Sequence, residues 1–373
     1  MAAPTTTSSD ARFRPAGLIA FATGLLTNSG LSEDRAHTVA ALLVEADLLG
    51  HTTHRLALLP AYLQQISIGG MAVSGEPKII SDRGAAIVWD GGRLPGVWLT
   101  SRAVAVACER ARAHGLAGVS IRNGHHIGGL AVFLEGPARN GLAVIIASSD
   151  PSVKGVAPYG GTAPLITPNP LAAGIPTDGD PILIDISASI ATLGLADRLR
   201  GAGQKFPAAW AIDAAGNPTD DPAVLTRDPP GTILPVGGID HGHKGYALGL
   251  LVEVLTQVLS GFGRADPPAG WGASVWVQVL DPAMFAGREA FMRQTSWLAN
   301  ACRANPPRPG LDSVRLPGEQ GLRRKRAALI NGLQLHPGIL DALQPWAERF
   351  GAGLPHTRLV RIPQTVDRLK GAS

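Results

Sequence analysis

The segment RNGHHIGGL (122–130) places two adjacent histidines between glycines, directly after a run of residues typical of a buried strand. Imidazole titrates near neutral pH and also binds metals, so this loop could transfer protons or hold a metal ion. Adjacent side chains on an extended backbone point to opposite sides, so His125 and His126 cannot easily ligate one metal together. Proton transfer and ordinary loop polarity therefore remain the two leading interpretations.

Two charged residues elsewhere also suggest chemistry. Asp185 lies in PILIDIS (181–187), where a carboxylate among apolar strand residues is unfavourable unless it pairs or acts. Lys244 precedes a long apolar segment and should occupy the first helical turn, where a cation opposes the helix dipole. That placement is reasonable if an anion such as a phosphate binds there. A structural partner for Asp185 and a solvent-facing Lys244 are the alternatives.

The sequence contains no strong motif for binding a nucleotide or a metal ion. No G-x-G start continues to a third glycine between a strand and a helix, and no phosphate-binding G-x-x-x-x-G-K-[ST] motif occurs. The histidine pairs 51/54 and 241/243 make a zinc site conceivable, but no acidic residue stands at the H-E-x-x-H spacing. We therefore expect no metal.

Hydrophobic periodicity predicts the elements that must position these residues. Helices are expected at 32–50, 54–65, 101–115, 130–141, 243–261, 286–303, 319–331 and 338–350, and strands at 116–121, 142–148, 181–187 and 274–280. The order strand, short helix, strand over 116–148 predicts a parallel βαβ unit. Long Pro- and Gly-rich segments are expected to be functional loops. The fold class is α/β.

Composition excludes several classes of protein. The 373 residues carry a net charge of +4, and their one basic cluster, RRKR (323–326), is typical of a solvated helix face, which argues against nucleic acid as a partner. No apolar run is long enough for a membrane span, and the polar start does not resemble a secretory signal. The only cysteines, Cys108 and Cys302, fit a reducing compartment. We expect a cytoplasmic protein with a small-molecule substrate.

Six segments, in order, resemble the malate/L-lactate dehydrogenase family, the non-Rossmann group that includes ureidoglycolate and sulfolactate dehydrogenases and piperideine-2-carboxylate reductase. The resemblance runs from about residue 31 to 351. The segments are EADLLGHTTHRLALLPAYL (45–63), RNGHHIGG (122–129), SSDPSVKGVAPYGGTAPLITPNPLAAGIP (148–176), LIDISAS (183–189), GHKGYALGLLVEVLTQVLSG (242–261) and VRLPGEQ (314–320).

The resemblance implies a three-layer α/β fold of the sulfolactate-dehydrogenase type, with a discontinuous nucleotide-binding domain that binds NAD or NADP. In this chain, residues 116–260 would form the nucleotide-binding domain. Residues 1–115 would form a helical, substrate-side region against which residues 260–373 pack. The family also implies a homodimer.

Roles follow from the same resemblance. His126 occupies the position of the family's acid–base residue, and His54 and Asp185 would help to orient substrate and water. The implied cofactor contacts are Ser149, Asp185, Ile186, Ser187, Lys244, Gly245, Gly318 and Glu319. The implied substrate contacts are Thr53, Arg55, Tyr62 and His125.

Several positions depart from the family pattern, and three of them bear on the substrate. Gly124 replaces a serine, Leu58 replaces an arginine that grips the substrate carboxylate, and Arg55 replaces a glycine. On a continuous helix, residues 54, 58 and 62 share a face, whereas Arg55 lies about 100° around it. Arg55 would therefore not substitute directly for the missing arginine.

The resulting expectation is an oxidoreductase that transfers hydride between NAD(P) and a small 2-hydroxy or 2-oxo acid, or a related cyclic imine. Two alternatives remain open. Leu58 and Gly124 are compatible with a divergent relative that binds cofactor without catalysis. The histidine pairs are compatible with a metallohydrolase, which would require bound zinc.

Overall fold

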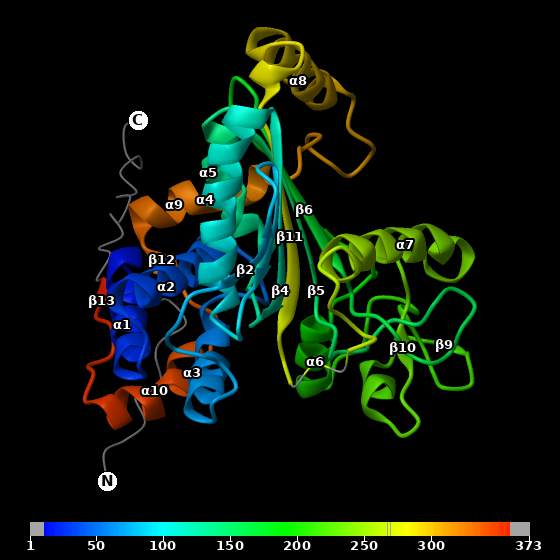
Figure 1. Cartoon of the computed structure of the whole chain (residues 1–373). Coiled ribbons are helices and arrows are strands. Elements are labelled where there is room, and N and C mark those ends of the chain that lie inside the picture. Colours follow the sequence, from blue (N-terminus) through cyan, green and yellow to red (C-terminus); the bar gives the residue numbers. More distant parts are fainter. Residues whose placement is uncertain (1–10, 267, 269, 359–373) are drawn as a thin grey trace, which may run out of the picture.

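The computed structural model describes residues 11–266, 268 and 270–358, and its centre is a seven-stranded mixed sheet (Figure 1). The strand order is β2-β3-β4-β11-β5-β6-β7, with β3 and β4 parallel and all other neighbours antiparallel. The strands are β2 (Lys78–Asp82), β3 (Ala86–Asp90), β4 (Leu116–Gly124), β5 (Ala143–Ser149), β6 (Pro170–Ile175), β7 (Ile182–Ser187) and β11 (Ala273–Leu280).

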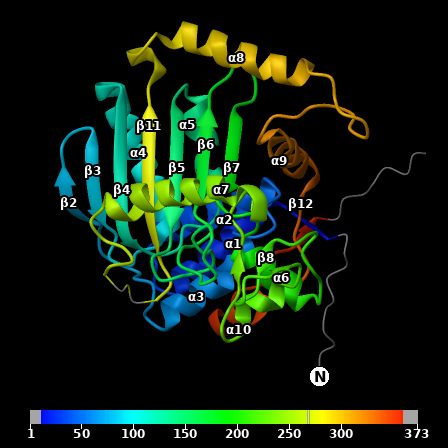
Figure 2. The same ribbon diagram turned by 90° about the vertical axis from the view of Figure 1, so that its right-hand side faces the viewer.

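Helices cover both faces of this sheet, which gives three layers (Figure 1). Helices α4 and α5 lie on one face, backed by α1 and α2, and α7 with its continuation η4 lies on the other. Helix α8 crosses above the ends of the strands (Figure 2). The helices are α1 (Pro15–Asn28), α2 (Glu33–Leu48), α3 (Leu59–Ser67), α4 (Gly96–His114), α5 (Glu135–Arg139), α6 (Leu193–Gly201), α7 (Gly238–Glu253), α8 (Arg288–Ala304), α9 (Glu319–Asn331) and α10 (Ile339–Phe350).

Shorter elements complete the fold. Two small sheets have the orders β12-β1-β13 and β10-β8-β9. Their strands are β1 (Arg12–Phe13), β8 (Ala211–Ile212), β9 (Pro218–Thr219), β10 (Thr232–Ile233), β12 (Leu333–Gln334) and β13 (Thr357–Arg358). The single turns are η1 (Leu56–Leu58), η2 (Leu130–Phe133), η3 (Pro222–Thr226), η4 (Val254–Val258) and η5 (Pro282–Met284).

The expected βαβ unit is incomplete. Strands β4 and β5 run in the same direction, but β11 lies between them and pairs antiparallel with both. Strand β11 comes more than a hundred residues later in the chain, so neither the spacing nor the periodicity of 116–148 could predict this insertion. The sheet also crosses residue 115, the expected domain boundary, because β3 pairs with β4.

Several expected elements were wrong in extent. The helix expected at 54–65 begins only at Leu59, where Pro60 suits a helix start, and His54 has a left-handed backbone with φ of 50°. Residues 130–141 form two short turns of helix, 130–133 and 135–139, instead of one helix, and Pro137 lies in the second turn. The Pro- and Gly-rich segment 158–176 contains strand β6. Helix α1 and strands β2 and β3 were not predicted at all.

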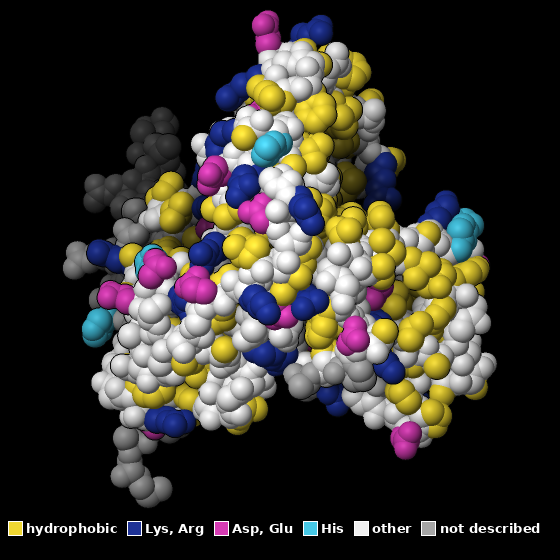
Figure 3. All heavy atoms as spheres, viewed as in Figure 1, with side chains coloured by type: hydrophobic (Ala, Val, Ile, Leu, Met, Phe, Trp, Pro, Cys, Tyr) yellow, Lys and Arg dark blue, Asp and Glu magenta, His cyan; other side chains and the backbone are white. Residues whose placement is uncertain are grey.

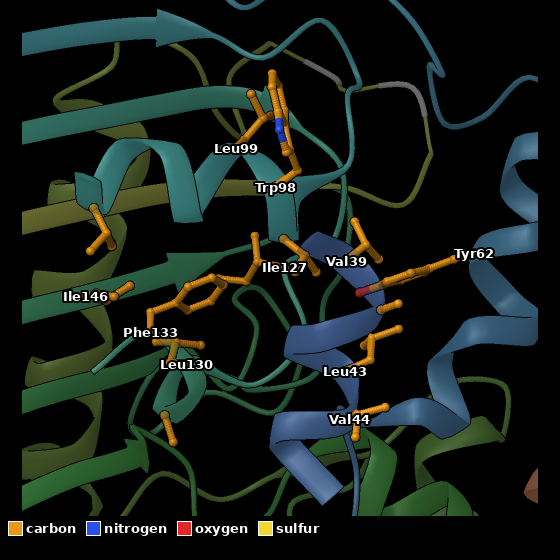
Figure 4. Close-up of a cluster of buried hydrophobic side chains, with 14 of the residues drawn as sticks. Val39, Leu43, Val44, Tyr62, Trp98, Leu99, Ile127, Leu130, Phe133 and Ile146 are labelled. Carbon is orange, nitrogen blue, oxygen red and sulfur yellow. The ribbon is translucent and has the colours of Figure 1, made fainter. Parts of the chain in front are cut away.

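The main core lies between the sheet and the helices of its α4 face and reaches directly beneath the histidine loop. Figure 4 shows Leu43 and Val44 of α2 in one cluster with Ile127 and Leu130, which flank the loop's end. Ile127 is 2% exposed and Leu130 is 3% exposed. This packing fixes the backbone that carries His126. A second, smaller core cluster lies within residues 156–233.

Within the described residues, no helix is both long and apolar enough to cross a membrane.

Candidate active site

A cavity of about 610 Å³ brings together seven of the predicted site residues. Its wall includes the ends of β5 and β7, the loop after β4, the segment before α3 and the first turn of α6. The predicted residues that line it are Thr53, His54, His126, Ser149, Asp185, Ile186 and Ser187.

The His126 ring lies in the cavity between two other rings. It lies 4.6 Å from the Trp271 ring and 5.4 Å from the His54 ring, measured between centroids. Burial, with further contributions from His54 and His125, holds its pKa well below the usual 6.5. The imidazole is therefore neutral at pH 7, which is the state that can accept a proton.

The buried Tyr62 supports this ring from behind. Its hydroxyl lies 2.8 Å from His126 Nδ1 and 3.3 Å from the His126 carbonyl oxygen, while the Gly128 N–H lies 3.3 Å from the same Nδ1. All of these contacts engage the Nδ1 side, and Nε2 has no protein partner among the described residues. Tyr62 was expected to contact substrate, but the structure places it behind the histidine, outside the cavity lining.

Gly96 explains how helix α4 can support the histidine loop so closely. A Cβ on Gly96 would collide with the carbonyl of His125 and lie 2.8 Å from the carbonyl oxygen of His126. Only a residue without a side chain lets the first turn of α4 pack against this backbone.

His54 faces the cavity beside His126, and its loop is tied to helix α2. Its Nδ1 lies 2.8 Å from Thr53 Oγ1, and burial lowers its pKa to about 4. The loop is anchored because the Leu56 N–H donates to the buried Asp47 carboxylate at 2.9 Å. Arg55 was expected to contact substrate, yet its guanidinium lies 3.6 Å from Asp47 and outside the cavity lining.

His125 is also placed differently from the expectation of a substrate contact. It is fully buried, and its ring packs edge-on against Tyr62 and Trp271 with centroid distances of 6.0 Å and 5.1 Å. Its Nε2 lies 3.4 Å from Gln65 Oε1. Because His125 and His126 alternate along an extended backbone, only His126 reaches the cavity.

Asp185 stands at the end of β7 and accepts a hydrogen bond from the Ala131 N–H at 2.9 Å. This contact links the strand to the turn that follows the histidine loop. Desolvation raises its pKa to about 6, and the Ala131 hydrogen bond only partly opposes the shift. The carboxylate is thus ionised above about pH 6 and neutral below it. Because the folded-state value is raised, its contribution to stability falls as pH rises from about 4 to 6.

We expect this titration to appear in the pH profile of the enzyme. In the oxidative direction, kcat/KM should rise through about pH 6 as Asp185 ionises, because a carboxylate in the same cavity stabilises the positive charge that His126 gains when it accepts the substrate proton. The Asp185→Asn variant should lose the rise of kcat/KM near pH 6. Its kcat/KM should then fall only at lower pH, where His126 becomes protonated. Asp213→Asn, at an exposed carboxylate outside the cavity, is the control. A step near pH 6 that persists in Asp185→Asn would contradict the assignment.

Ser149 belongs to a buried polar network that the sequence analysis missed. Its hydroxyl donates to Glu253 Oε1 at 2.8 Å and accepts from Gln257 Nε2 at 2.9 Å. Glu253 also accepts from Asn169 Nδ2 at 2.9 Å and pairs with Arg264, whose Nε and Nη2 each lie 2.9 Å from its carboxylate. The Ser149 hydroxyl therefore points into the protein and not toward a ligand.

Lys244 and Gly245 lie outside the cavity. The backbone of α7 is non-helical at His241, so Lys244 does sit in the first turn of the regular segment that follows, and its side chain is exposed. Gly245 is buried where a Cβ would collide with the Val236 backbone. Neither residue therefore contributes to the cavity wall, and Gly245 allows α7 to pack closely against the Val236 backbone.

Gly318 lines an adjoining cavity of about 290 Å³, which shares His51, Asp185 and Ile186 with the main one. Its neighbour Glu319 accepts from the Leu316 N–H at 3.0 Å and lies 3.3 Å from Arg303. The Glu319 carboxylate is thus held by the protein at the start of α9.

Trp271 is the contact residue that sequence reasoning missed. The signal was available, since a tryptophan between glycines directly before strand β11 is typical of a loop that presents an aromatic ring. Glu253 offered a similar signal, because it is a carboxylate within the longest apolar helix.

No described group of three or more His, Cys, Asp and Glu side chains is arranged to hold a metal ion. The metallohydrolase alternative gains no support from this geometry.

Comparison with known proteins agrees with this architecture. The family model described as malate/L-lactate dehydrogenase matches residues 13–344. An L-lactate dehydrogenase from Cupriavidus necator is 32% identical over 341 residues, covering 89% of this chain and 95% of the relative.

Solved structures share the fold. Malate dehydrogenase from Entamoeba histolytica superimposes with a TM-score of 0.86 at 24% identity, covering 92% of this chain and 99% of that chain. Sulfolactate dehydrogenase from Methanocaldococcus jannaschii gives 0.80 at 25% identity, covering 91% and 98%. These matches confirm the expected sulfolactate-dehydrogenase-like α/β fold.

Fold, cavity and relatives together define a dehydrogenase that acts on CH–OH groups. The chain belongs to the malate/L-lactate dehydrogenase family, as the six sequence segments predicted.

Proposed function

We propose that this chain interconverts a small 2-hydroxy acid with its 2-oxo acid, or a related cyclic amine with its imine, using NAD or NADP, with His126 as the acid–base residue. The observation that carries the proposal is the His126 ring at the cavity wall. It is neutral, stacked between two aromatic side chains and held at Nδ1 by Tyr62. Nε2 is the ring atom left to exchange a proton with substrate.

The proton transfer between substrate and His126 can be written with side chains that the structure contains. In the tautomer that carries its proton on Nδ1, Nε2 accepts the substrate hydroxyl proton during oxidation, and the imidazolium keeps it. The Nδ1–H then donates a hydrogen bond to the Tyr62 oxygen, and the Tyr62 hydroxyl donates one to the His126 carbonyl oxygen at 3.3 Å. During reduction the imidazolium returns the Nε2 proton to the substrate oxygen or nitrogen. Stacking on Trp271 also stabilises the transient cation.

The donor set of the cavity fits a nicotinamide nucleotide. Asp185 and Asp197 supply acceptors for ribose hydroxyls, and Thr192 with the first turn of α6 supplies hydroxyl and backbone N–H groups suited to an anion. When bound, the nicotinamide provides the hydride donor or acceptor. The described lining contains no Lys or Arg, so nothing in it selects NADP over NAD.

Titration of the purified protein with NADH and NADPH, followed by a screen of 2-oxo acids and cyclic imines for oxidation of the reduced cofactor, tests the proposal. Turnover with at least one of these compounds is expected. Cofactor binding without turnover across the whole screen would instead favour a non-catalytic relative.

We also propose that the protein is a cytoplasmic homodimer. Both cysteines are free thiols, as a reducing compartment requires. Hydrophobic side chains gather over α7 and η4 (Figure 3). Leu251, Val254, Val258 and Leu259 there are 50%, 50%, 67% and 52% exposed. An apolar surface of this kind is typical of a subunit interface.

Placing charges in that surface should separate the subunits. Leu251→Asp combined with Val258→Asp is expected to convert the dimer to monomer, because two carboxylates cannot be buried unpaired in an apolar interface. Light scattering after size exclusion measures the mass. Leu329→Asp, at an exposed leucine on α9, should remain dimeric. A wild-type protein that is monomeric at micromolar concentration would refute the proposal.

A further inference from the structure

The cavity around His126 has an unusual charge pattern for a protein that binds anions. Of the described residues that line it, three are aspartates, namely Asp150, Asp185 and Asp197, and none is lysine or arginine. Three nearby arginines are paired with carboxylates, because Arg55 faces Asp47, Arg264 faces Glu253, and Arg200 lies 3.0 Å from the largely exposed Asp197. A ligand in this cavity therefore meets negative side chains and neutral donors.

The remaining lining is largely apolar. Leu58, Ile127, Val153, Leu193 and Trp271 all contribute to it. Leu58 lines the cavity together with His126. It lies four residues before Tyr62, whose hydroxyl contacts the His126 ring, so the Leu58 side chain forms part of the wall near this imidazole. This wall can receive an aliphatic or aromatic substituent.

These two observations bear on which 2-hydroxy acids the cavity accepts. One carboxylate can be satisfied by neutral donors such as imidazole, hydroxyl and backbone N–H groups. A second carboxylate or a sulfonate would be desolvated beside Asp150 and Asp185, with no lysine or arginine in the described lining to pair with it, which is strongly unfavourable.

We infer that the physiological substrate is a monocarboxylic 2-hydroxy acid, or its 2-oxo form, whose side chain is uncharged and apolar, and that Leu58 selects against dicarboxylates. This inference rests on the proposed function, since it specifies the substrate class of the same site.

Matched pairs of 2-oxo acids test it directly. 2-Oxopentanoate and 2-oxoglutarate have the same chain length and differ in a terminal methyl against a terminal carboxylate, and 2-oxobutanoate and oxaloacetate form a shorter pair. With the better of NADH and NADPH, kcat/KM should favour the apolar member of each pair by roughly 100-fold or more, as expected for an unpaired charge in a closed site.

The variant Leu58→Arg should reverse this preference by placing a cation in the wall. It is expected to raise kcat/KM for 2-oxoglutarate by about 10-fold or more and to lower that for 2-oxopentanoate. Leu58→Met keeps the wall apolar and should keep the wild-type order. Leu329→Arg adds the same charge on the exposed face of α9 and should leave both values unchanged.

The outcomes are distinguishable. A wild-type enzyme that prefers the dicarboxylate members overturns the inference while leaving the proposed function intact. An unchanged ratio in a folded Leu58→Arg variant removes Leu58 as the selecting residue. Absence of turnover with every compound of both series contradicts the proposed function and, with it, this inference.

Discussion

Replacing His126 with alanine is expected to reduce kcat by roughly 100- to 10,000-fold, the range typical of losing a general acid–base. The cofactor Kd should change little, because the other lining residues and the first turn of α6 remain in place. Steady-state kinetics combined with a fluorescence titration of NADH binding separate the two effects. The loss should be greatest at the pH at which the wild-type enzyme is fastest.

His241→Ala is the matched control, since this histidine is exposed on α7 and does not line the cavity. It should retain wild-type kinetics. Turnover of His126→Ala close to that of the wild type would refute the assignment of the acid–base residue. Tyr62→Phe provides a graded comparison, because it removes the hydrogen bond at Nδ1 but leaves the imidazole. Its effect should be smaller and should include a shifted pH profile.

Replacing Arg264 with methionine should have the largest effect on stability. Arg264 pairs with the buried Glu253 and also donates to the carbonyl oxygens of Pro151, Val153 and Asp150, which ties the loop after η4 to the loop after β5. Its loss leaves the Glu253 carboxylate buried without a cation. We expect the free energy of unfolding to fall by about 3 kcal/mol or more, measured by denaturant titration.

Arg227→Met tests whether any lost ion pair has this effect. Arg227 pairs with Asp221 at 2.7 Å, but the two side chains are 58% and 36% exposed, so its loss should change stability by less than about 1 kcal/mol. The double variant Arg264→Met with Glu253→Met should regain part of the lost stability, because neither charge then remains unpaired. Equal effects of the two single variants would show that the network around Ser149 is not a special source of stability.

Much of the fold followed from local pattern. Helices α9 and α10 and strands β4, β5, β7 and β11 lie within a few residues of their predicted positions, because their apolar periodicity and their bounding glycines are local properties. The prediction of a helix beginning at His54 was wrong for an equally local reason. Leu58, Leu59 and Tyr62 have helical spacing, but the left-handed backbone at His54 delays the helix until Leu59.

Sequence by itself therefore determined the fold class and the family, and it predicted His126 in preference to its neighbour, because these depend on residue types in fixed order along the chain. The tertiary structure alone decided what surrounds that histidine. Strand β11 enters between β4 and β5, Trp271 and Tyr62 converge on the ring, and Arg55 turns to Asp47, so the described cavity lining contains no lysine or arginine. Such contacts join residues far apart in the chain, and their free energies depend on packing and desolvation that no local pattern encodes.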